Sequence, residues 1–292
     1  ARRQRQMCIR DRVTGVAPKV ISHTYEDDND MLTCKYPTGR IIRYTRDVLD
    51  RTKDIVENDV SINIVEYRYI GPGGRLMEKE YRNGTLLRYH DGAGVGDGYD
   101  AIKRIVKHEN IKGTTNIATF DYTYDREDNR LDEVRTNNKS FSETDNYDYD
   151  SAYRLLDVTG SQTQSWSLDG VGNWNSFDLG GGNQTTTENE MNEYSTFAGS
   201  TRVHDDNGNL TDDGEFLYKY DFKNRLREVR RKSDDALFSE YDYDAMDRRV
   251  RRFITANTIY GKGLDLNYFY DGINCIDERV TDDSFFAQYV FG

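Results

Sequence analysis

The chain has 292 residues, of which 12% are aromatic and 32% are charged, and its mean hydropathy is −0.89. No apolar run approaches the ~18 residues of a membrane-spanning helix, and a formal charge of −12 disfavours nucleic acid as a partner. The composition therefore predicts a soluble protein without a membrane span, and its 22 Tyr predict a Tyr-rich core.

The first twelve residues, ARRQRQMCIRDR, differ from the rest because they carry five Arg and one Asp. Residues 2–12 match the in-frame translation of a common transposase sequencing adapter. We therefore expect residues 1–12 to be an unstructured, adapter-derived segment and leave them out of the reasoning about the fold. On this interpretation the natural N-terminus lies outside the sequence. The alternative is a basic N-terminal arm.

The cysteine and histidine pattern gives no metal motif. Cys8 lies in the adapter-like segment, and Cys34 and Cys275 are far apart in sequence, which predicts two unpaired thiols. None of the four histidines belongs to an H-E-x-x-H motif or lies at zinc spacing from a Cys. These histidines are His23, His90, His108 and His204.

From about residue 40 to 275 the chain repeats one phrase, Y-x-Y-D-x-x-G-R-L, at a loose period near twenty residues. Internal repeats of this length are typical of arrays in which each unit packs on its neighbours. The copies, in chain order, are YTRDVLDRT (44–52), YRYIGPGGRL (67–76, one residue longer), GYDAIKRIV (98–106), YTYDREDNRL (122–131, with Asn129 inserted before Arg130), YDYDSAYRL (147–155), WSLDGVGNW (166–174), HDDNGNLT (204–211), YKYDFKNRL (218–226), YDYDAMDRR (241–249) and the partial YFYDGIN (268–274).

Each copy predicts a β-hairpin. Tyr-x-Tyr has the period of a strand, so both rings lie on one face. Asp-x-x-Gly fits a type I turn whose fourth residue is left-handed and forms a bulge. Asp50, Asn224 and Asp247 suit that left-handed position, whereas Tyr153 and Lys103 each cost ~1 kcal/mol there. A lone hairpin is marginal in water, so the copies must pack on one another.

Three other segments have competing interpretations. TRDVLDRTKDIVEN (45–58) suits a short amphipathic helix, but the repeat frame favours turn and strand. DGAGVGDG (91–98) is Gly-rich, yet it lacks the strand, helix and Lys of a phosphate loop and is interpreted as an irregular connection. DDNGNLTDDGE (205–215) resembles a calcium loop, but Leu210 and Phe216 occupy the positions of the required Gly and Glu, which favours two tight turns.

The tandem phrase resembles the YD-repeat, or RHS-repeat, family. YIGPGGRLMEKEYRNGT (69–85) and DDNGNLTDDGEFLYKYDFKNRLREV (205–229) resemble longer segments of that family. The resemblance implies a long β-sheet that spirals into a hollow shell, which in bacterial members often encloses a C-terminal toxin; animal relatives act in cell adhesion. The family's D-P-x-G-L-type autocleavage motif is absent, so we expect an internal fragment of such a shell.

We therefore expect an all-β array of tandem hairpins in a curved, twisted, open antiparallel sheet, continuous over residues 13–292. The resemblance implies a non-catalytic shell segment at a bacterial cell surface, without a cofactor, whose partner is the rest of its own chain. The alternative is a surface adhesion or carbohydrate-binding module, in which the Tyr-Asp pairs contact sugars. The pairs recur in every unit, which favours a structural role for the repeat-defining residues. These are Tyr122, Tyr124, Asp125, Tyr147, Tyr149, Asp150, Arg154, Asp169, Gly172, Asp205, Gly208, Tyr218, Tyr220, Asp221, Arg225, Tyr241, Tyr243, Asp244, Arg248, Tyr270 and Asp271.

Overall fold

The computed structural model describes residues 4–9, 19–28, 30–58, 62–89, 98–255, 263–280, 282 and 284–291. These residues form 27 strands and no helix, so none of the described segments is a helix that could cross a membrane. The strands belong to antiparallel sheets of 18 and nine strands. This confirms the prediction of an open, all-β array of hairpins.

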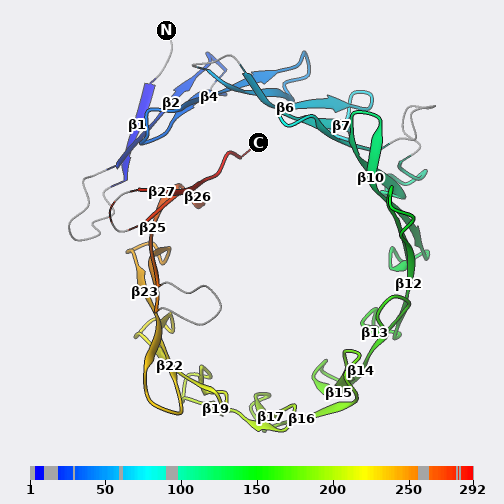
Figure 1. The fold of residues 1–292 in the computed structure, drawn as a ribbon, viewed down its shortest axis with the longest axis vertical. Coiled ribbons are helices and arrows are strands. Elements are labelled where there is room, and N and C mark those ends of the chain that lie inside the picture. The colour runs from blue at the N-terminus through cyan, green and yellow to red at the C-terminus, as the bar shows by residue number, and fades with distance from the viewer. Residues whose placement is uncertain are drawn as a thin grey trace. The chain divides into compact units, whose positions relative to one another are not determined.

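The chain divides into two compact units, which we call the middle unit (residues 29–33 and 40–185) and the end unit (residues 1–28, 34–39 and 186–292). In the middle unit each strand pairs antiparallel with the next strand of the chain (Figure 1). Its strands are β4 (Ile41–Arg46), β5 (Thr52–Glu57), β6 (Ile62–Tyr69), β7 (Leu76–Tyr81), β8 (Thr85–Arg88), β9 (Lys107–Lys112), β10 (Thr115–Tyr124), β11 (Arg130–Thr136), β12 (Ser142–Tyr149), β13 (Leu155–Thr159), β14 (Gln164–Leu168) and β15 (Trp174–Asp178).

In the end unit, each strand from β19 to β27 also pairs antiparallel with the next strand of the chain, and β1 pairs with β2. Two strands, β3 (Met31–Lys35) and β16 (Gln184–Glu188), contain residues of both units. The strands of the end unit are β1 (Gln4–Ile9), β2 (Lys19–Tyr25), β17 (Tyr194–Phe197), β18 (Ser200–Thr201), β19 (Val203–His204), β20 (Leu210–Asp212), β21 (Phe216–Tyr220), β22 (Leu226–Arg231), β23 (Leu237–Tyr243), β24 (Arg249–Ile254), β25 (Leu264–Asp271), β26 (Asn274–Val280) and β27 (Phe285–Gln288).

The repeat phrase forms the predicted hairpin turn. In the copy at 147–155, the Tyr153 amide donates to the Asp150 carbonyl at 3.0 Å, and the Asp150 amide donates to the Arg154 carbonyl at 2.9 Å. Tyr153 is left-handed, with φ 62°, and the strand register shifts beside the turn, between Asp148 and Tyr149. A type I turn followed by a left-handed residue and a bulge is a common three-residue hairpin connection.

The left-handed position of these turns is occupied by the residues that the template predicted, and one alignment is corrected. Asp128, not an inserted Asn129, is left-handed in the turn after β10, so Asn129 takes the place of the template Arg. Asp tolerates this conformation because its side chain bonds the local backbone. The left-handed residues at this position of the predicted copies are Asp50, Lys103, Asp128, Tyr153, Gly172, Gly208, Asn224 and Asp247.

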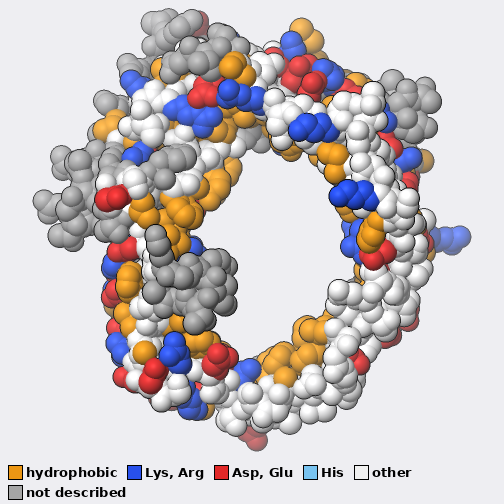
Figure 2. Space-filling model, viewed as in Figure 1, with side chains coloured by type: hydrophobic (Ala, Val, Ile, Leu, Met, Phe, Trp, Pro, Cys, Tyr) orange, Lys and Arg blue, Asp and Glu red, His pale blue; other side chains and the backbone are white. Residues whose placement is uncertain are grey.

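The core differs between the units. Most strands of the middle unit have no more than two buried residues, as expected of a single sheet with one covered face. In the end unit four consecutive residues of β25, Leu266 to Phe269, are buried. Because successive side chains point to opposite faces, both faces of β25 are covered. Figure 2 shows hydrophobic side chains gathered near β25 and a mixture of hydrophobic and charged side chains near β22 and β23.

Residues 4–9 correct one expectation. The sequence predicted an unstructured segment over residues 1–12, but residues 4–9 form β1, which pairs antiparallel with β2 from Gln4–Thr24 to Ile9–Lys19. The unpaired backbone groups of a strand edge accept another strand largely irrespective of its side chains, which accounts for this pairing. The adapter origin of the segment stays a prediction.

The structure also bears on the three segments that had competing interpretations. Residues 45–58 form the end of β4, a turn and β5, so the preferred turn-and-strand interpretation is confirmed. Most of the Gly-rich segment 91–98 lies outside the described residues. In the segment 205–215, Asp205 closes one turn and Asp213 accepts hydrogen bonds from two following amides, so two tight turns are present. That residues 13–292 are a single domain stays a prediction.

Candidate functional site in the repeat turns

Most repeat turns are organised by the carboxylate of an Asp. In the turn after β21, Asp221 Oδ1 accepts hydrogen bonds from the Lys223 amide at 2.9 Å and from the Arg225 amide at 3.1 Å, while Oδ2 accepts from Arg225 Nε at 2.8 Å. One side chain thus satisfies two turn amides and positions the Arg. The same three bonds occur at Asp47, Asp100, Asp150 and Asp244, and an Asn replaces the Arg at Asp125, Asp169 and Asp205.

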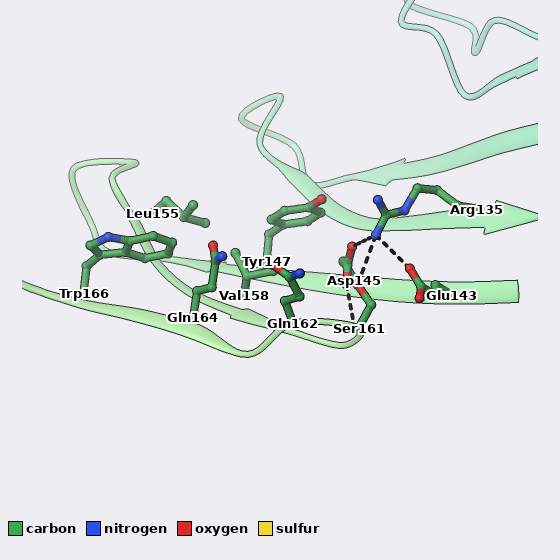
Figure 3. A pocket seen from close by; sticks show the side chains of 10 residues that line it. All are labelled: Arg135, Glu143, Asp145, Tyr147, Leu155, Val158, Ser161, Gln162, Gln164 and Trp166. Carbon is green, nitrogen blue, oxygen red and sulfur yellow. Dashed lines mark hydrogen bonds and ion pairs between the residues drawn. The ribbon is translucent and has the colours of Figure 1, made fainter. Parts of the chain in front are cut away.

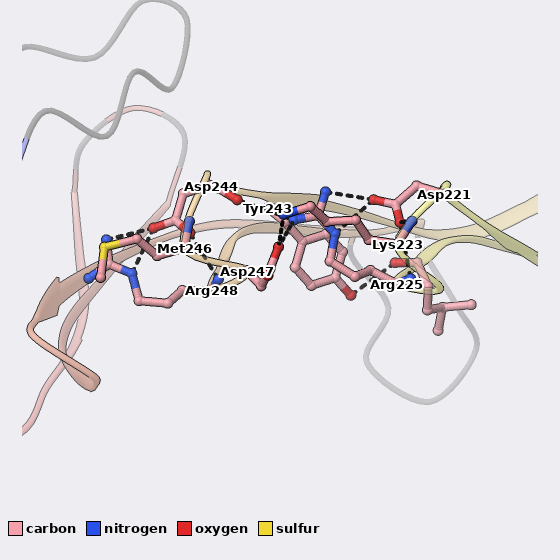
Figure 4. Close-up of polar contacts among 9 residues, drawn as sticks. Asp221, Lys223, Arg225, Tyr243, Asp244, Met246, Asp247 and Arg248 are labelled. Carbon is pink, nitrogen blue, oxygen red and sulfur yellow. Dashed lines mark hydrogen bonds and ion pairs between the residues drawn. The ribbon is translucent and has the colours of Figure 1, made fainter.

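The Arg then reaches the next turn of the array. Arg225 Nη1 donates to the Asp244 carbonyl at 3.2 Å and to Asp247 Oδ1 at 2.7 Å, and Lys223 contacts the same carboxylate at 2.9 Å (Figure 4). Its guanidinium therefore lies between two successive Asp turns. The equivalent contacts join Arg51 to the carbonyls of Gly71 and Gly73, Arg104 to that of Asp125, Arg154 to that of Asp169 and Arg248 to that of Gly272.

The second Tyr of the phrase makes the reverse contact. Tyr243 Oη donates to the Leu226 carbonyl at 3.0 Å, one residue after the Arg of the preceding turn. The ring of Tyr243 also lies under Arg225, whose Cζ is 4.8 Å from the ring centroid, a favourable arrangement for a cation and an aromatic face. Five other second tyrosines donate in the same way, Tyr69 to Thr52, Tyr99 to Leu76, Tyr124 to Ile105, Tyr220 to Leu210 and Tyr270 to Arg249.

These contacts shift the pKa values in the directions that stabilise the turns. The Arg225 guanidinium and the turn amides lower the pKa of the Asp221 carboxyl to about 2. The Asn209 side chain lowers the pKa of the Asp205 carboxyl. Burial raises the pKa of the Tyr270 hydroxyl to about 12, so it remains a hydrogen-bond donor at neutral pH. The carboxylates of Asp221 and Asp205 thus act as acceptors bonded within their turns.

The predicted repeat-defining residues do not all have the same environment. The Asp, Arg and Gly residues of the phrase lie in the turns. Most of the second tyrosines contact the preceding turn, as described above. The first tyrosines differ from each other: Tyr122 stacks on His108 and under Arg130, and Tyr218 donates to Asp213 at 2.6 Å. Asp271 differs most, because a two-residue loop follows it and its carboxylate contacts His23 instead of a turn amide.

Sequence reasoning missed two turns of the same type. In the turn at 189–193, Asn189 accepts from the amides of Met191 and Glu193 and Asn192 is left-handed. In the turn at 137–141, Asn137 accepts from the amides of Lys139 and Phe141. Asn has the same amide-accepting oxygen as Asp. Neither turn follows a Tyr-x-Tyr or precedes an Arg-Leu, so a template that requires those residues does not find them.

A pocket of about 480 Å³ lies in the middle unit over β11 to β14. At one end, Arg135 forms ion pairs with Glu143, at 3.3 Å, and with Asp145. At the other end lies Trp166, whose buried indole nitrogen has no hydrogen-bond partner among the described residues. Figure 3 shows these side chains projecting from the same side of the strands. The remaining lining residues are Tyr147, Leu155, Val158, Ser161, Gln162 and Gln164.

The pocket has the features of a binding surface. An aromatic ring, two amides and an ionised pair offer both a stacking face and hydrogen-bonding groups. Its carboxylates already accept hydrogen bonds within the protein. Asp145 accepts from Arg135 and from the hydroxyl of Ser161 at 2.9 Å, and Glu143 accepts from Arg135. Neither carboxylate is arranged as a proton donor, so the geometry suits recognition rather than acid–base chemistry.

Comparison with known proteins identifies the repeat. The profile of the Teneurin YD-shell family matches residues 73–275. The chain belongs to this family. The match spans the turns from the one after β6 to the one after β25, and it shows that the chain is a shell-forming YD segment.

Curated relatives match over a shorter stretch. The chain is 34% identical over 106 residues to the tRNA nuclease WapA of Bacillus subtilis, and 32% identical over 106 residues to the tRNA3(Ser)-specific nuclease WapA of Bacillus spizizenii. Each match covers 36% of this chain and 4% of the relative. The chain thus corresponds to a small part of these nucleases.

Solved structures share the fold over nearly the whole chain. The structure of the Photorhabdus luminescens Tc holotoxin pore superposes with a TM-score of 0.72 at 14% identity, covering 95% of this chain and 16% of that one. The crystal structure of TcdB2-TccC3 superposes with a TM-score of 0.69 at 15% identity, covering 95% of this chain and 17% of that one. At this identity the likeness establishes the fold alone.

Proposed function

We propose that this YD segment is a non-catalytic part of the wall of a shell that encloses a toxin carried by the same polypeptide at a bacterial cell surface. The observation that carries the proposal is the chain of contacts between successive turns. Arg225 reaches forward to the turn at Asp244, and Tyr243 reaches back to the turn before it. Repeated links of this kind hold a sheet at a set spacing, which is what a wall requires.

The charges of the turns support a structural role. The same Asp–Arg contact recurs in the turns at Asp47, Asp100, Asp150, Asp221 and Asp244, and none of these five turns has an arrangement of its own that suggests chemistry. Catalysis needs a few groups whose environments set them apart from their siblings. In this proposal the activity of the full-length protein resides in the enclosed domain.

The WapA relatives provide a direct test of the non-catalytic part of the proposal. The purified chain is incubated with total tRNA, with and without Mg²⁺, and the RNA is resolved by denaturing electrophoresis. We expect intact tRNA at every time point. Cleavage that persists in an independently purified preparation, and that is lost after heat denaturation of the protein, would show that the YD segment itself is catalytic.

The enclosing role is tested on the source DNA. Long-read sequencing across the locus should show the reading frame continuing beyond residue 292 into a shell-closing D-P-x-G segment and an unrelated C-terminal domain. It should also lack the codons for Arg2 to Arg12. A frame that runs into more repeats and a wall or membrane anchor would make the array an adhesin and would rule out the cage.

The pocket over β11 to β14 favours a second function, carbohydrate binding. Indole rings stack on sugar rings, and Gln162 and Gln164 offer amide groups for hydroxyls. A glycan array probed with the purified chain tests this function. Binding that is lost in Trp166→Ala and kept in Tyr153→Ala, which changes an exposed ring outside the pocket, would support it. An array without a signal would exclude it for the glycans displayed.

A further inference from the structure

Three side chains that are distant in sequence meet in the end unit. His23 is on β2, Cys34 is on β3 and Asp271 is the last residue of β25. His23 is 6% exposed and Cys34 is 3% exposed. His23 Nε2 lies 2.8 Å from Asp271 Oδ2. One nitrogen, one sulfur and one oxygen atom of the three residues all lie within 4.8 Å of one another.

This set of donor atoms fits a transition metal. Zn²⁺ takes Cys sulfur at about 2.3 Å, His nitrogen at about 2.0 Å and carboxylate oxygen at about 2.1 Å, in a tetrahedron. Such bond lengths place neighbouring donor atoms roughly 3.3–3.7 Å apart. The observed separations, from 2.8 Å to at most 4.8 Å, span that range, so side-chain shifts of about an ångström bring all three atoms onto one ion.

We propose that His23, Cys34 and Asp271 bind a Zn²⁺ ion that fastens the segment from β2 to β3 onto the end of β25. Three protein ligands leave one tetrahedral position for water. The mixture of a soft sulfur with nitrogen and oxygen favours Zn²⁺ over Ca²⁺ or Mg²⁺, which take oxygen ligands.

The surroundings are consistent with a fastening role. Two residues after Cys34, the hydroxyl of buried Tyr36 donates to the carbonyl of Tyr289 at 2.8 Å, a further contact with the end of the chain. The buried core of β25, including Leu266 and Tyr268, lies on the strand that supplies Asp271. A metal bound to the folded chain and not to the unfolded chain stabilises it in proportion to the logarithm of its concentration. Zn²⁺ binds Cys as the thiolate, so binding would release the proton of the Cys34 thiol to solvent.

Asp271 supplies a second indication. In the other YD copies that have this Asp, its carboxylate accepts hydrogen bonds from the amides of its own turn, as Asp244 does from Met246 and Arg248. Asp271 instead precedes a two-residue loop, and its carboxylate is directed to His23. The last copy has thus exchanged the turn contact for a contact with a potential metal ligand.

A cobalt titration tests the thiolate ligand. In a background with Cys8→Ser and Cys275→Ser, Cys34 is the only thiol of the chain. Adding Co²⁺ should produce a thiolate-to-cobalt charge-transfer band that saturates at one equivalent and disappears when Zn²⁺ is added. The band should be absent in the further variant Cys34→Ser. A background protein without the band, or a band that survives Cys34→Ser, would overturn the proposal.

A second variant keeps the test valid if Cys34→Ser does not fold. Asp271→Asn retains an oxygen that accepts the hydrogen bond from His23 but removes the charge. Zn²⁺ should raise the melting temperature of the wild-type protein, and Asp271→Asn should bind Zn²⁺ at least tenfold more weakly. Asp265→Asn on the same strand is the matched control, because Asp265 pairs with Arg251, and it should keep the full zinc-dependent shift. Equal shifts in all three proteins would show that these residues are not the site.

Discussion

Single tyrosine hydroxyls connect each repeat to the one before it, and Tyr243 is the clearest case. Its hydroxyl donates to the carbonyl of Leu226. Tyr243→Phe removes the donor and keeps the ring, so it should lower the free energy of unfolding by about 1 kcal/mol, the usual net value of such a bond. Urea unfolding measures this change. Tyr153→Phe, in an exposed ring, is the control and should have no effect; equal losses in both variants would contradict the proposed link.

The left-handed turn residues offer a stabilising change at the same scale. Tyr153 has φ 62° and the residue is 60% exposed, so the conformation is strained while the side chain buries little surface. Tyr153→Asn should therefore raise the free energy of unfolding by about 0.5 kcal/mol, because Asn tolerates this conformation better. Gly172→Ala, at φ 101°, should have the opposite effect. A lower melting temperature for Tyr153→Asn would show that the ring contributes more than the strain costs.

At the scale of the element, the hairpin turn was predictable and its links to neighbouring turns were not. Asp150 and Tyr153 take their places in the turn because of residue preferences within a single turn, and the nine-residue phrase includes the whole turn. The reach of Arg154 to the carbonyl of Asp169 depends on which strands are neighbours, and the phrase itself does not contain that information. The contact of His23 with Asp271 joins positions 248 residues apart, so no local spacing rule could predict it.

The carboxylates of the turns predict how stability depends on pH. Arg225 and the turn amides lower the pKa of Asp221 to about 2, and Asp47 and Asp205 are lowered in the same direction. A carboxyl whose folded pKa is lowered stabilises the fold above its unfolded pKa, near 4, and this stability is lost as the pH falls through the folded value. Melting temperatures should therefore hold steady from pH 7 to about 5 and fall steeply towards pH 2.

The matched variant for this pH dependence is Asp221→Asn. It removes one of the titrating carboxyls and brings an amide group close to Arg225 Nε. The variant should be less stable than the wild type at pH 7 and should lose less of its remaining stability on acidification. A wild-type melting temperature that rises as the pH falls below 4 would mean that repulsion among the many carboxylates outweighs their contacts in the turns.

At the scale of the whole molecule, both compact units are built from consecutive antiparallel hairpins, but their cores differ. Where β25 is covered on both faces, residues from the beginning of the chain, such as Tyr36 and His23, contact residues from its end. The repeat phrase predicts the sheet but not this second layer, since the template describes neighbours along the array. The buried run from Leu266 to Phe269 indicates the second layer locally. In a strand with one solvent-exposed face, buried and exposed residues alternate instead.

This difference predicts how the molecule unfolds. Leu266 is fully buried, so Leu266→Ala should remove about 2–5 kcal/mol from the stability of the end unit. Both tryptophans, Trp166 and Trp174, belong to the middle unit, so their fluorescence reports on that unit, whereas far-ultraviolet circular dichroism reports on all strands. In repeat arrays each repeat contacts chiefly its neighbours. We therefore expect Leu266→Ala to shift part of the circular dichroism transition in urea and to leave the midpoint of the fluorescence transition unchanged.

The control is Phe177→Ala, which truncates a buried ring in the middle unit next to Trp174 and should shift the fluorescence midpoint. If Leu266→Ala moves both transitions by the same amount, the array unfolds as one cooperative domain, as the continuous repeat over residues 13–292 predicts. If only the circular dichroism moves, continuity of the repeat does not produce cooperativity across it. Stability along such a wall would then be set repeat by repeat, through contacts like that of Arg225 with the turn at Asp244.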